Sequence, residues 1–192
     1  MKKTKKNDIL KVCITLFLIT AIISLCLAGL NMLTKDKIAA HIGQKEFDTV
    51  RSYYVYGTTF EKKLSDPLTS TEQFEYYEAT YAEGDCAGYA TTVSVNGYGG
   101  EIKMTVCFDT LGQVNGMGII EWSETGGVGT RIEGEGFFEQ FIGKVAPFKS
   151  VKGDPSAKNE ISALSGATVS SRAATAAVNK AYTLLADFFI ED

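Results

Sequence analysis

The sequence predicts an α+β protein in which a single N-terminal transmembrane helix precedes an antiparallel-sheet domain flanked by helices. Three observations predict this class. Val12–Leu33 is an uncharged run of 22 residues, residues 75–121 hold segments that alternate like β-strands, and residues 172–189 follow the apolar period of a helix. We therefore divide the chain into a cytoplasmic segment (1–11), a span (12–33), a juxtamembrane helix and linker (34–72) and a domain (73–192).

The apolar run is long enough to cross a membrane, because 22 residues of helix extend about 33 Å. A cleaved signal peptide is the alternative interpretation. Its apolar region would measure only about 7–15 residues, and Ala28–Asn31 is a poor cleavage signal. Five lysines precede Val12, so we expect a cytoplasmic N-terminus, one pass through the cell (cytoplasmic) membrane and an extracytoplasmic C-terminal domain.

The charge distribution excludes one class of partner. Residues 1–33 carry a net charge of +4, whereas residues 34–192 carry 14 Lys and Arg against 22 Asp and Glu. An acidic domain does not suit nucleic acid, whose phosphates need a cationic surface. The single histidine, His41, directly follows the predicted span, and the cysteines have no metal-ligand spacing. We therefore expect neither nucleic acid nor a metal ion as a partner. The predicted span makes membrane lipid an expected partner.

Four short segments rich in Val, Ile, Thr and Tyr predict an antiparallel meander, because turn-forming residues separate them by only a few positions. The predicted strands are Tyr76–Tyr81, Gly88–Val95, Ile102–Asp109 and Val114–Glu121. Pairing of the middle two places Cys107 opposite Ala90. A disulfide to Cys86 then requires the chain before Gly88 to bend back, since the Cα atoms of a bridge lie within about 7 Å.

The remaining segments are predicted from composition and period. Residues 34–54 read as a helix that leaves the membrane, and Tyr56–Thr71 has only turn composition. Phe137–Val145 reads as a short helix with core phenylalanines, and Ile161–Leu164 as a short extended piece. The last helix buries one apolar face, formed by Ala177, Val178, Ala181, Leu184, Leu185 and Phe188.

The stretch Leu164–Ser171 combines tiny and hydroxylated residues directly before this helix. One interpretation is an ordinary helix start capped by Ser or Thr side chains. The other is an anion site, because Gly166 allows close backbone approach and a helix N-terminus favours a phosphate. The residues alone leave both interpretations open.

The run Ser165-Gly166-Ala167-Thr168-Val169-Ser170-Ser171 resembles the flavinylation motif of the FMN-binding domain family, and the resemblance extends over about residues 31–185. It implies an FMN-binding domain that carries FMN covalently, through a phosphoester on Thr168, with the other residues of the run around the cofactor. Ser162 stands where the family motif often has an acidic residue. The sequence does not give the effect of that difference.

A second loop has three glycines in residues 121–131. It lacks the spacing of a P-loop or a Rossmann site, so a surface turn is its plain interpretation. The loop also resembles the family's flavin-side loop, with Trp122 where His is common and Gly126 in place of Pro. This resemblance implies cofactor contacts from Trp122, Glu124, Thr125, Gly127, Val128 and Gly129.

The resemblance implies an electron-carrier subunit without catalysis of its own, in a membrane complex of the Rnf type, which links ferredoxin and NAD redox chemistry to ion movement. It implies the other membrane subunits and a separate FMN transferase as partners. Two alternatives stay open: a stand-alone flavinylated protein for extracellular electron transfer, and a membrane-anchored module that binds a non-redox ligand. The ion, the flavin potential and the immediate redox partners do not follow from the sequence.

Overall fold

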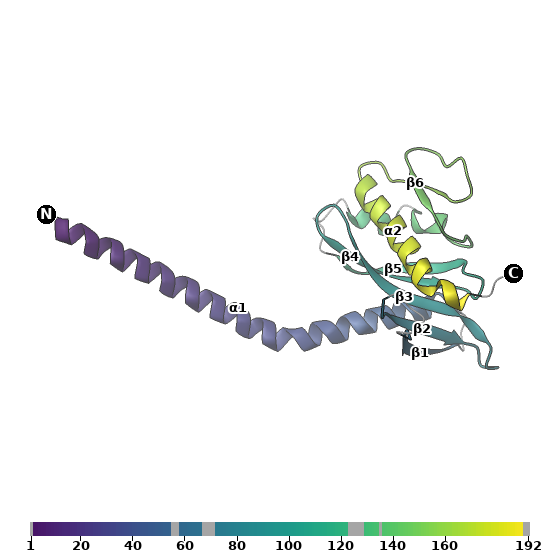
Figure 1. Ribbon diagram of the computed structural model, residues 1–192, viewed down its shortest axis with the longest axis horizontal. Coiled ribbons are helices and arrows are strands. Elements are labelled where there is room, and N and C mark those ends of the chain that lie inside the picture. Colours follow the sequence, from purple (N-terminus) through teal and green to yellow (C-terminus); the bar gives the residue numbers. More distant parts are fainter. Residues whose placement is uncertain (1, 55–57, 67–71, 123–128, 135, 190–192) are drawn as a thin grey trace. The chain divides into compact units, whose positions relative to one another are not determined.

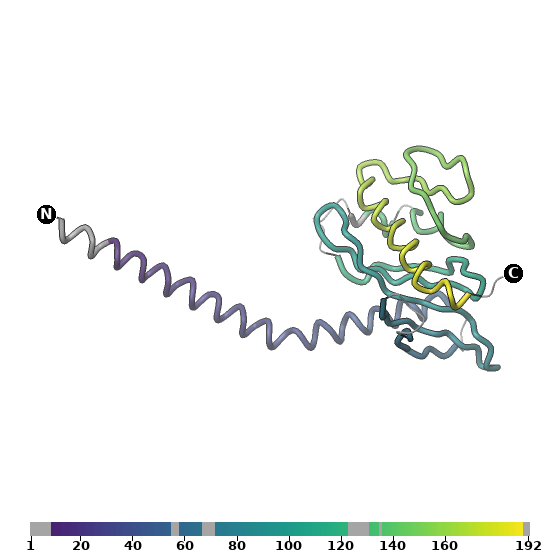
Figure 2. The backbone as a smooth tube through the Cα atoms, viewed as in Figure 1, coloured from purple at the N-terminus to yellow at the C-terminus, as the bar shows by residue number. Residues whose placement is uncertain are grey.

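The computed structural model describes residues 2–54, 58–66, 72–122, 129–134 and 136–189 (Figures 1 and 2). The chain divides into two compact units, Met1–Gly43 and Gln44–Asp192. The long helix α1, Lys2–Ser52, supplies most of the first unit and the beginning of the second. The first unit holds the predicted span, and the second holds the strands.

Helix α1 contains the predicted membrane span. Its apolar stretch near the N-terminus is long enough to cross a membrane, and its mean hydropathy is 2.6. The apolar side chains there are more than half exposed at most positions, as at Phe17 (70%) and Leu25 (77%). Exposed apolar surface of this extent requires a lipid or protein cover, which agrees with one pass through a bilayer.

The second unit is built on a five-stranded antiparallel sheet in the order β1-β2-β3-β4-β5, so each strand pairs with its neighbour in the chain. This is the predicted meander, with one further strand at its start. The strands are β1 (Thr59–Leu64), β2 (Glu75–Thr80), β3 (Cys86–Asn96), β4 (Glu101–Phe108) and β5 (Val114–Trp122). Short turns fix this topology because they allow only antiparallel neighbours.

The strand register agrees with the prediction from the hairpin turn. Ala90 pairs with Cys107, and Cys86 pairs with Thr80 of β2 beside a register shift. Both cysteines are free thiols, and Cys107 is fully buried. Burial raises the pKa of the Cys107 thiol, so it packs as a neutral apolar group.

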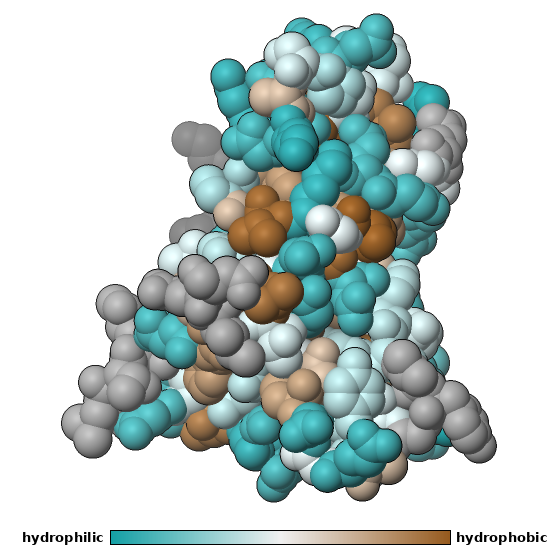
Figure 3. All heavy atoms as spheres, turned by 90° about the vertical axis from the view of Figure 1, so that its right-hand side faces the viewer, coloured by the Kyte–Doolittle hydropathy of each residue, from teal (hydrophilic) through white to brown (hydrophobic). Residues whose placement is uncertain are grey.

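One face of the sheet carries the main core, covered by helix α2, Thr168–Leu185, which lies across the strands in Figure 1. Alternate residues of each strand point to this face. Fully buried members include Ile102, Met104, Val106, Phe108, Ile132, Phe137, Phe141, Ile161, Ala174, Ala177, Val178, Ala181 and Leu185. On the side shown in Figure 3, apolar residues reach the surface as separate spots among polar ones, the pattern of a water-exposed domain.

The opposite face of the sheet receives the last turns of α1. A Cβ on Gly116 of β5 would collide with the ring of Tyr53, so glycine lets the helix end lie close to the strand. The Tyr53 hydroxyl donates to the Met117 carbonyl at 2.8 Å. The Tyr54 hydroxyl donates to the carbonyls of Phe108 (2.8 Å) and Tyr89 (3.0 Å), and burial raises the pKa of this phenol. A protonated phenol therefore joins the helix end to two strands.

Several predicted elements are wrong in detail. Tyr56–Thr71 is more than a turn, because it contains strand β1. Phe137–Val145 is not a regular helix, since only the 3-10 turn η2, Phe138–Gln140, forms there, although Phe137 and Phe141 are core residues as expected. Leu184 and Phe188 are half-buried, and Phe188 lies in the 3-10 turn η3, Ala186–Phe188, after α2.

A small parallel pair of strands, β6 (Lys149–Val151) and β7 (Glu160–Ser162), leads into α2. Strand β7 confirms an extended piece before Leu164, whereas β6 was not predicted. Asn179 of α2 fixes this region: its amide accepts from the Phe148 N–H at 2.7 Å and donates to the Phe148 carbonyl at 2.8 Å. The chain before Thr168 is thus held against the helix that follows Thr168.

Candidate functional site

Helix α2 begins at Thr168, directly after the loop that leaves β7. Its N-cap residue is Ala167, which has no side-chain oxygen and makes no capping hydrogen bond. The interpretation of this stretch as an ordinary start with a Ser or Thr N-cap is therefore wrong. The first N–H groups of a helix lack acceptors within the helix, and a helix N-terminus favours an anion.

The two serines after Thr168 are inside the protein. Ser170 and Ser171 are fully buried. The Ser171 hydroxyl donates to the Ala167 carbonyl at 2.9 Å and accepts from the Leu164 N–H at 3.1 Å. Ser171 therefore ties the loop Leu164–Ala167 to the first turn of α2.

Thr168 itself is half-exposed and lines a pocket of about 390 Å³. The other lining residues are Tyr98, Gly166, Ala167, Val169 and Ser170. Tyr98 comes from the turn between β3 and β4 and is 71% exposed, and Val169 is 46% exposed. The pocket thus combines a hydroxyl at a helix N-terminus with an exposed aromatic ring and an aliphatic side chain, a mixture typical of ligand sites.

A basic side chain reaches this loop from a distant part of the chain. Arg131 lies in the 3-10 turn η1, Gly129–Glu133, and its Nη1 donates to the Ser165 carbonyl at 2.8 Å. Gly166 has a φ of +82°, and a Cβ on it would lie 3.3 Å from the same nitrogen. The positive φ therefore favours glycine at position 166, and the guanidinium lies close to where a side chain would begin.

The glycine-rich loop is only partly within the described residues. Glu124, Thr125, Gly127 and Val128 lie outside them, so their proposed contacts stay predictions. Trp122 ends β5, is half-buried and packs against the main core. Gly129 begins η1, the turn that also carries Arg131. The sequence alone did not indicate Arg131, because no local signal connects it to a loop 34 residues away.

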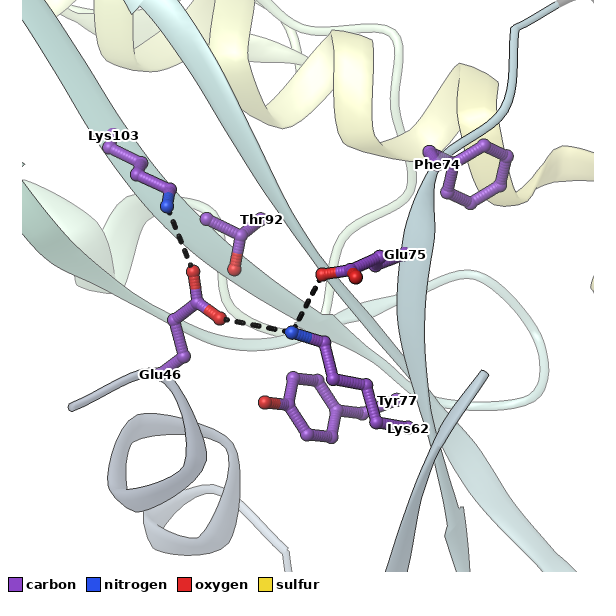
Figure 4. A pocket seen from close by; sticks show the side chains of 7 residues that line it. All are labelled: Glu46, Lys62, Phe74, Glu75, Tyr77, Thr92 and Lys103. Carbon is purple, nitrogen blue, oxygen red and sulfur yellow. Dashed lines mark ion pairs between the residues drawn. The ribbon is translucent and has the colours of Figure 1, made fainter. Parts of the chain in front are cut away.

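A second hollow, of about 200 Å³, lies on the other face of the sheet (Figure 4). Glu46, from the end of α1, points between two lysines and is 8% exposed; its carboxylate oxygens lie 3.7 Å from Lys62 Nζ and 3.2 Å from Lys103 Nζ. Lys62 also pairs with Glu75 at 2.7 Å. Since these four charges are paired, we interpret the hollow as the attachment of the helix end to β1 and β4.

Comparison with known proteins identifies the domain that contains Thr168. Residues 97–183 match the FMN-binding domain family. The matched segment includes Tyr98, Arg131 and the whole loop before α2, so the pocket described above lies within it.

Relatives of this protein match it over nearly its whole chain. The chain is 28% identical to the G subunit of the Na(+)-translocating ferredoxin:NAD(+) oxidoreductase complex of Acetobacterium woodii, covering 89% of this chain and 88% of that one. It is 27% identical to the G subunit of the proton-translocating ferredoxin:NAD(+) oxidoreductase complex of Clostridium ljungdahlii, covering 97% of each. These names agree with the resemblance to Rnf-type subunits.

Solved structures show the same fold. The C subunit of the Na(+)-translocating NADH-quinone reductase from Parabacteroides distasonis aligns with a TM-score of 0.59 and 14% identity, over 83% of this chain and 98% of that chain. NqrC of Shewanella oneidensis aligns with a TM-score of 0.54 and 13% identity, over 72% and 85% of the two chains. The predicted fold class, an apolar helix followed in the chain by an antiparallel sheet with flanking helices, is confirmed.

The residues around Thr168 fit FMN. An uncapped helix N-terminus and the nearby Arg131 suit a phosphate, and Gly166 leaves the loop open where any side chain would meet the guanidinium. A pocket of about 390 Å³ is within the range of small-molecule sites. Tyr98 and Val169 offer apolar surface for a flat ring system.

Proposed function

We propose that the chain is a single-pass membrane flavoprotein that holds FMN covalently on Thr168 and relays electrons within an Rnf-type ferredoxin:NAD ion-translocating oxidoreductase complex. One observation carries the proposal. In a domain of the FMN-binding family, the half-exposed hydroxyl of Thr168 borders a pocket at an uncapped helix N-terminus. The names of the relatives along almost the whole chain support the complex.

Attachment of the cofactor requires a second protein. The Thr168 oxygen bonds to the phosphorus of the FMN unit of FAD, the hydroxyl proton is released, and the pyrophosphate bond breaks so that AMP leaves. No electrons are transferred in this exchange. A threonine hydroxyl needs a base for it, and the only histidine, His41, lies in α1. A separate FMN transferase therefore supplies the catalysis, and Thr168 is the residue modified.

The protein's own task after attachment is placement. FMN supplies the electron chemistry when bound. Thr168 keeps the cofactor at an effective concentration in the millimolar range or higher, which suits a site outside the cytoplasm, where free FMN is scarce. The helix N-terminus alone contributes only about 0.3–1 kcal/mol to an anion, so the covalent bond is what retains the cofactor.

Complementation tests the relay directly. In cells that lack the chromosomal copy, wild-type protein should restore ferredoxin-dependent NAD reduction by isolated membranes. Thr168→Val should be inserted in equal amount and restore none of this activity. Full activity with Thr168→Val would contradict a relay through this residue. Full activity in the deletion strain itself would contradict a role in the complex and would favour a stand-alone flavinylated carrier.

The orientation of the anchor is a separate prediction. Because five lysines precede Val12, the N-terminus should remain in the cytoplasm and the FMN-binding domain should lie outside. Cys86 is first replaced by Ser because it is only half-buried and could react with the reagent, whereas the buried Cys107 is protected. On intact cells, a membrane-impermeant thiol reagent should then label Ser156→Cys, an exposed position, and spare Thr4→Cys. The reverse labelling pattern would contradict an extracytoplasmic flavin.

A further inference from the structure

Arg131 contacts the loop before Thr168 and so connects the η1 turn to the start of α2. The guanidinium donates to the Ser165 carbonyl at 2.8 Å and lies against Gly166, whose missing side chain leaves it the space. Ser165 and Gly166 are exposed, and Arg131 is exposed as well. A cation thus stands at the water-facing side of the loop that leads into Thr168.

A guanidinium can hold the loop and meet a phosphate at the same time. It has five N–H donors in a planar fork, so one side chain can serve several acceptors. Arginine therefore suits a phosphate oxygen better than lysine, which has no fork. Because the chain beyond residue 33 carries a net charge of −8, a phosphodiester there needs a local cation.

The main competitor for this role is Arg172, on the same helix as Thr168 and four residues after it. Residues four apart lie on one face of a helix, and long side chains lean toward the helix N-terminus. Arg172 is exposed. Arg131, in contrast, bonds directly to the loop 164–167, through the Ser165 carbonyl. This contact favours Arg131.

We propose that Arg131 is the positioning residue of the flavin site: it orders the Ser165–Thr168 loop for modification and afterwards pairs with the phosphodiester on Thr168. The inference rests on the proposed function, because it assumes that Thr168 carries the phosphate. It assigns the role to a residue of the η1 turn, outside the run that contains Thr168.

The test follows the rate of flavin attachment to the full-length protein in membranes that contain an FMN transferase. The flavinylated fraction is read by intact mass at successive times. Arg131→Gln should slow attachment about tenfold or more, the factor expected from one hydrogen bond to a charged group. Arg131→Lys, which keeps the charge without the fork, should recover part of the rate. Lys180→Gln, an equal charge change at an exposed position of α2, should leave the rate unchanged.

A second readout reports on the phosphate itself. In fully modified protein, the phosphorus NMR resonance of the phosphodiester should shift in Arg131→Gln and stay in place in Lys180→Gln. If Arg131→Gln does not fold, as judged by protease resistance, Arg131→Lys decides by the same two measurements. A wild-type rate together with an unshifted resonance in the Arg131 variant used would overturn the inference, as would a larger effect of Arg172→Gln.

The proposed function and the role of Arg131 can fail separately. If wild-type protein receives no flavin beside an active transferase, the proposed function fails. If wild-type protein is modified and the Arg131 variants match it in rate and phosphorus resonance, the proposed function stands and only the role of Arg131 fails.

Discussion

Thr168→Val is expected to abolish the covalent flavin completely. Valine keeps the branched shape of threonine and removes the hydroxyl oxygen that forms the phosphoester bond. Thr168 is half-exposed, so the change should alter the free energy of unfolding by less than about 0.5 kcal/mol, as at most surface positions. In-gel flavin fluorescence of protein made beside an FMN transferase should be lost, while the amount of inserted protein stays the same.

Thr183→Val is the matched control for this experiment. Thr183 is exposed on the same helix, and its hydroxyl donates to the Asn179 carbonyl at 2.9 Å within the helix. The same chemical change there should leave the fluorescent band at wild-type intensity. A fluorescent Thr168→Val band would place the flavin on another residue.

Gly116→Ala should produce a large loss of stability. The new Cβ would collide with the ring of Tyr53, and a shift of the ring would disturb its hydrogen bond to the Met117 carbonyl. We expect the free energy of unfolding to fall by about 2 kcal/mol, the size of an overpacking effect with a lost hydrogen bond. Pulse proteolysis of the full-length protein in detergent at increasing urea concentration measures it.

Gly43→Ala provides a control of opposite sign. Gly43 is also in α1, and a Cβ there meets nothing within 4 Å. Alanine should therefore stabilise the helix by up to about 1 kcal/mol. If both substitutions shift the urea midpoint in the same direction, the close packing of the helix end on β5 is not what makes glycine necessary at position 116.

The strands β2–β5 could be predicted because their alternation and their turns agree. In β3 and β4, apolar residues face α2 while Ala90 and Cys107 face the end of α1, and a turn of about four residues leaves little freedom of register. Strand β1 escaped prediction because Glu61, Lys62 and Lys63 make it read as a polar segment. It is an edge strand, where charged side chains are common, and its lysines pair with glutamates of β2.

The candidate site was predictable only where it follows one continuous run of sequence. Thr168 came from the motif, and the structure places it beside a pocket. The capping interpretation failed because Ser and Thr favour caps on average, whereas here Ser171 turns inward to hold Leu164 and Ala167. The contact of Arg131 depends on how η1 and the loop before α2 meet in the fold, and local sequence patterns do not report such long-range packing.

Peptide mapping of the full-length protein made beside an FMN transferase tests covalent FMN on Thr168 most directly. Tryptic cleavage after Lys158 and Arg172 releases one peptide that contains Thr168 together with the hydroxyls of Ser162, Ser165, Ser170 and Ser171. We predict that this peptide is heavier by the mass of FMN less one water and that its fragment ions place the addition on Thr168. An unmodified peptide, or an addition on one of the serines, would contradict covalent FMN on Thr168.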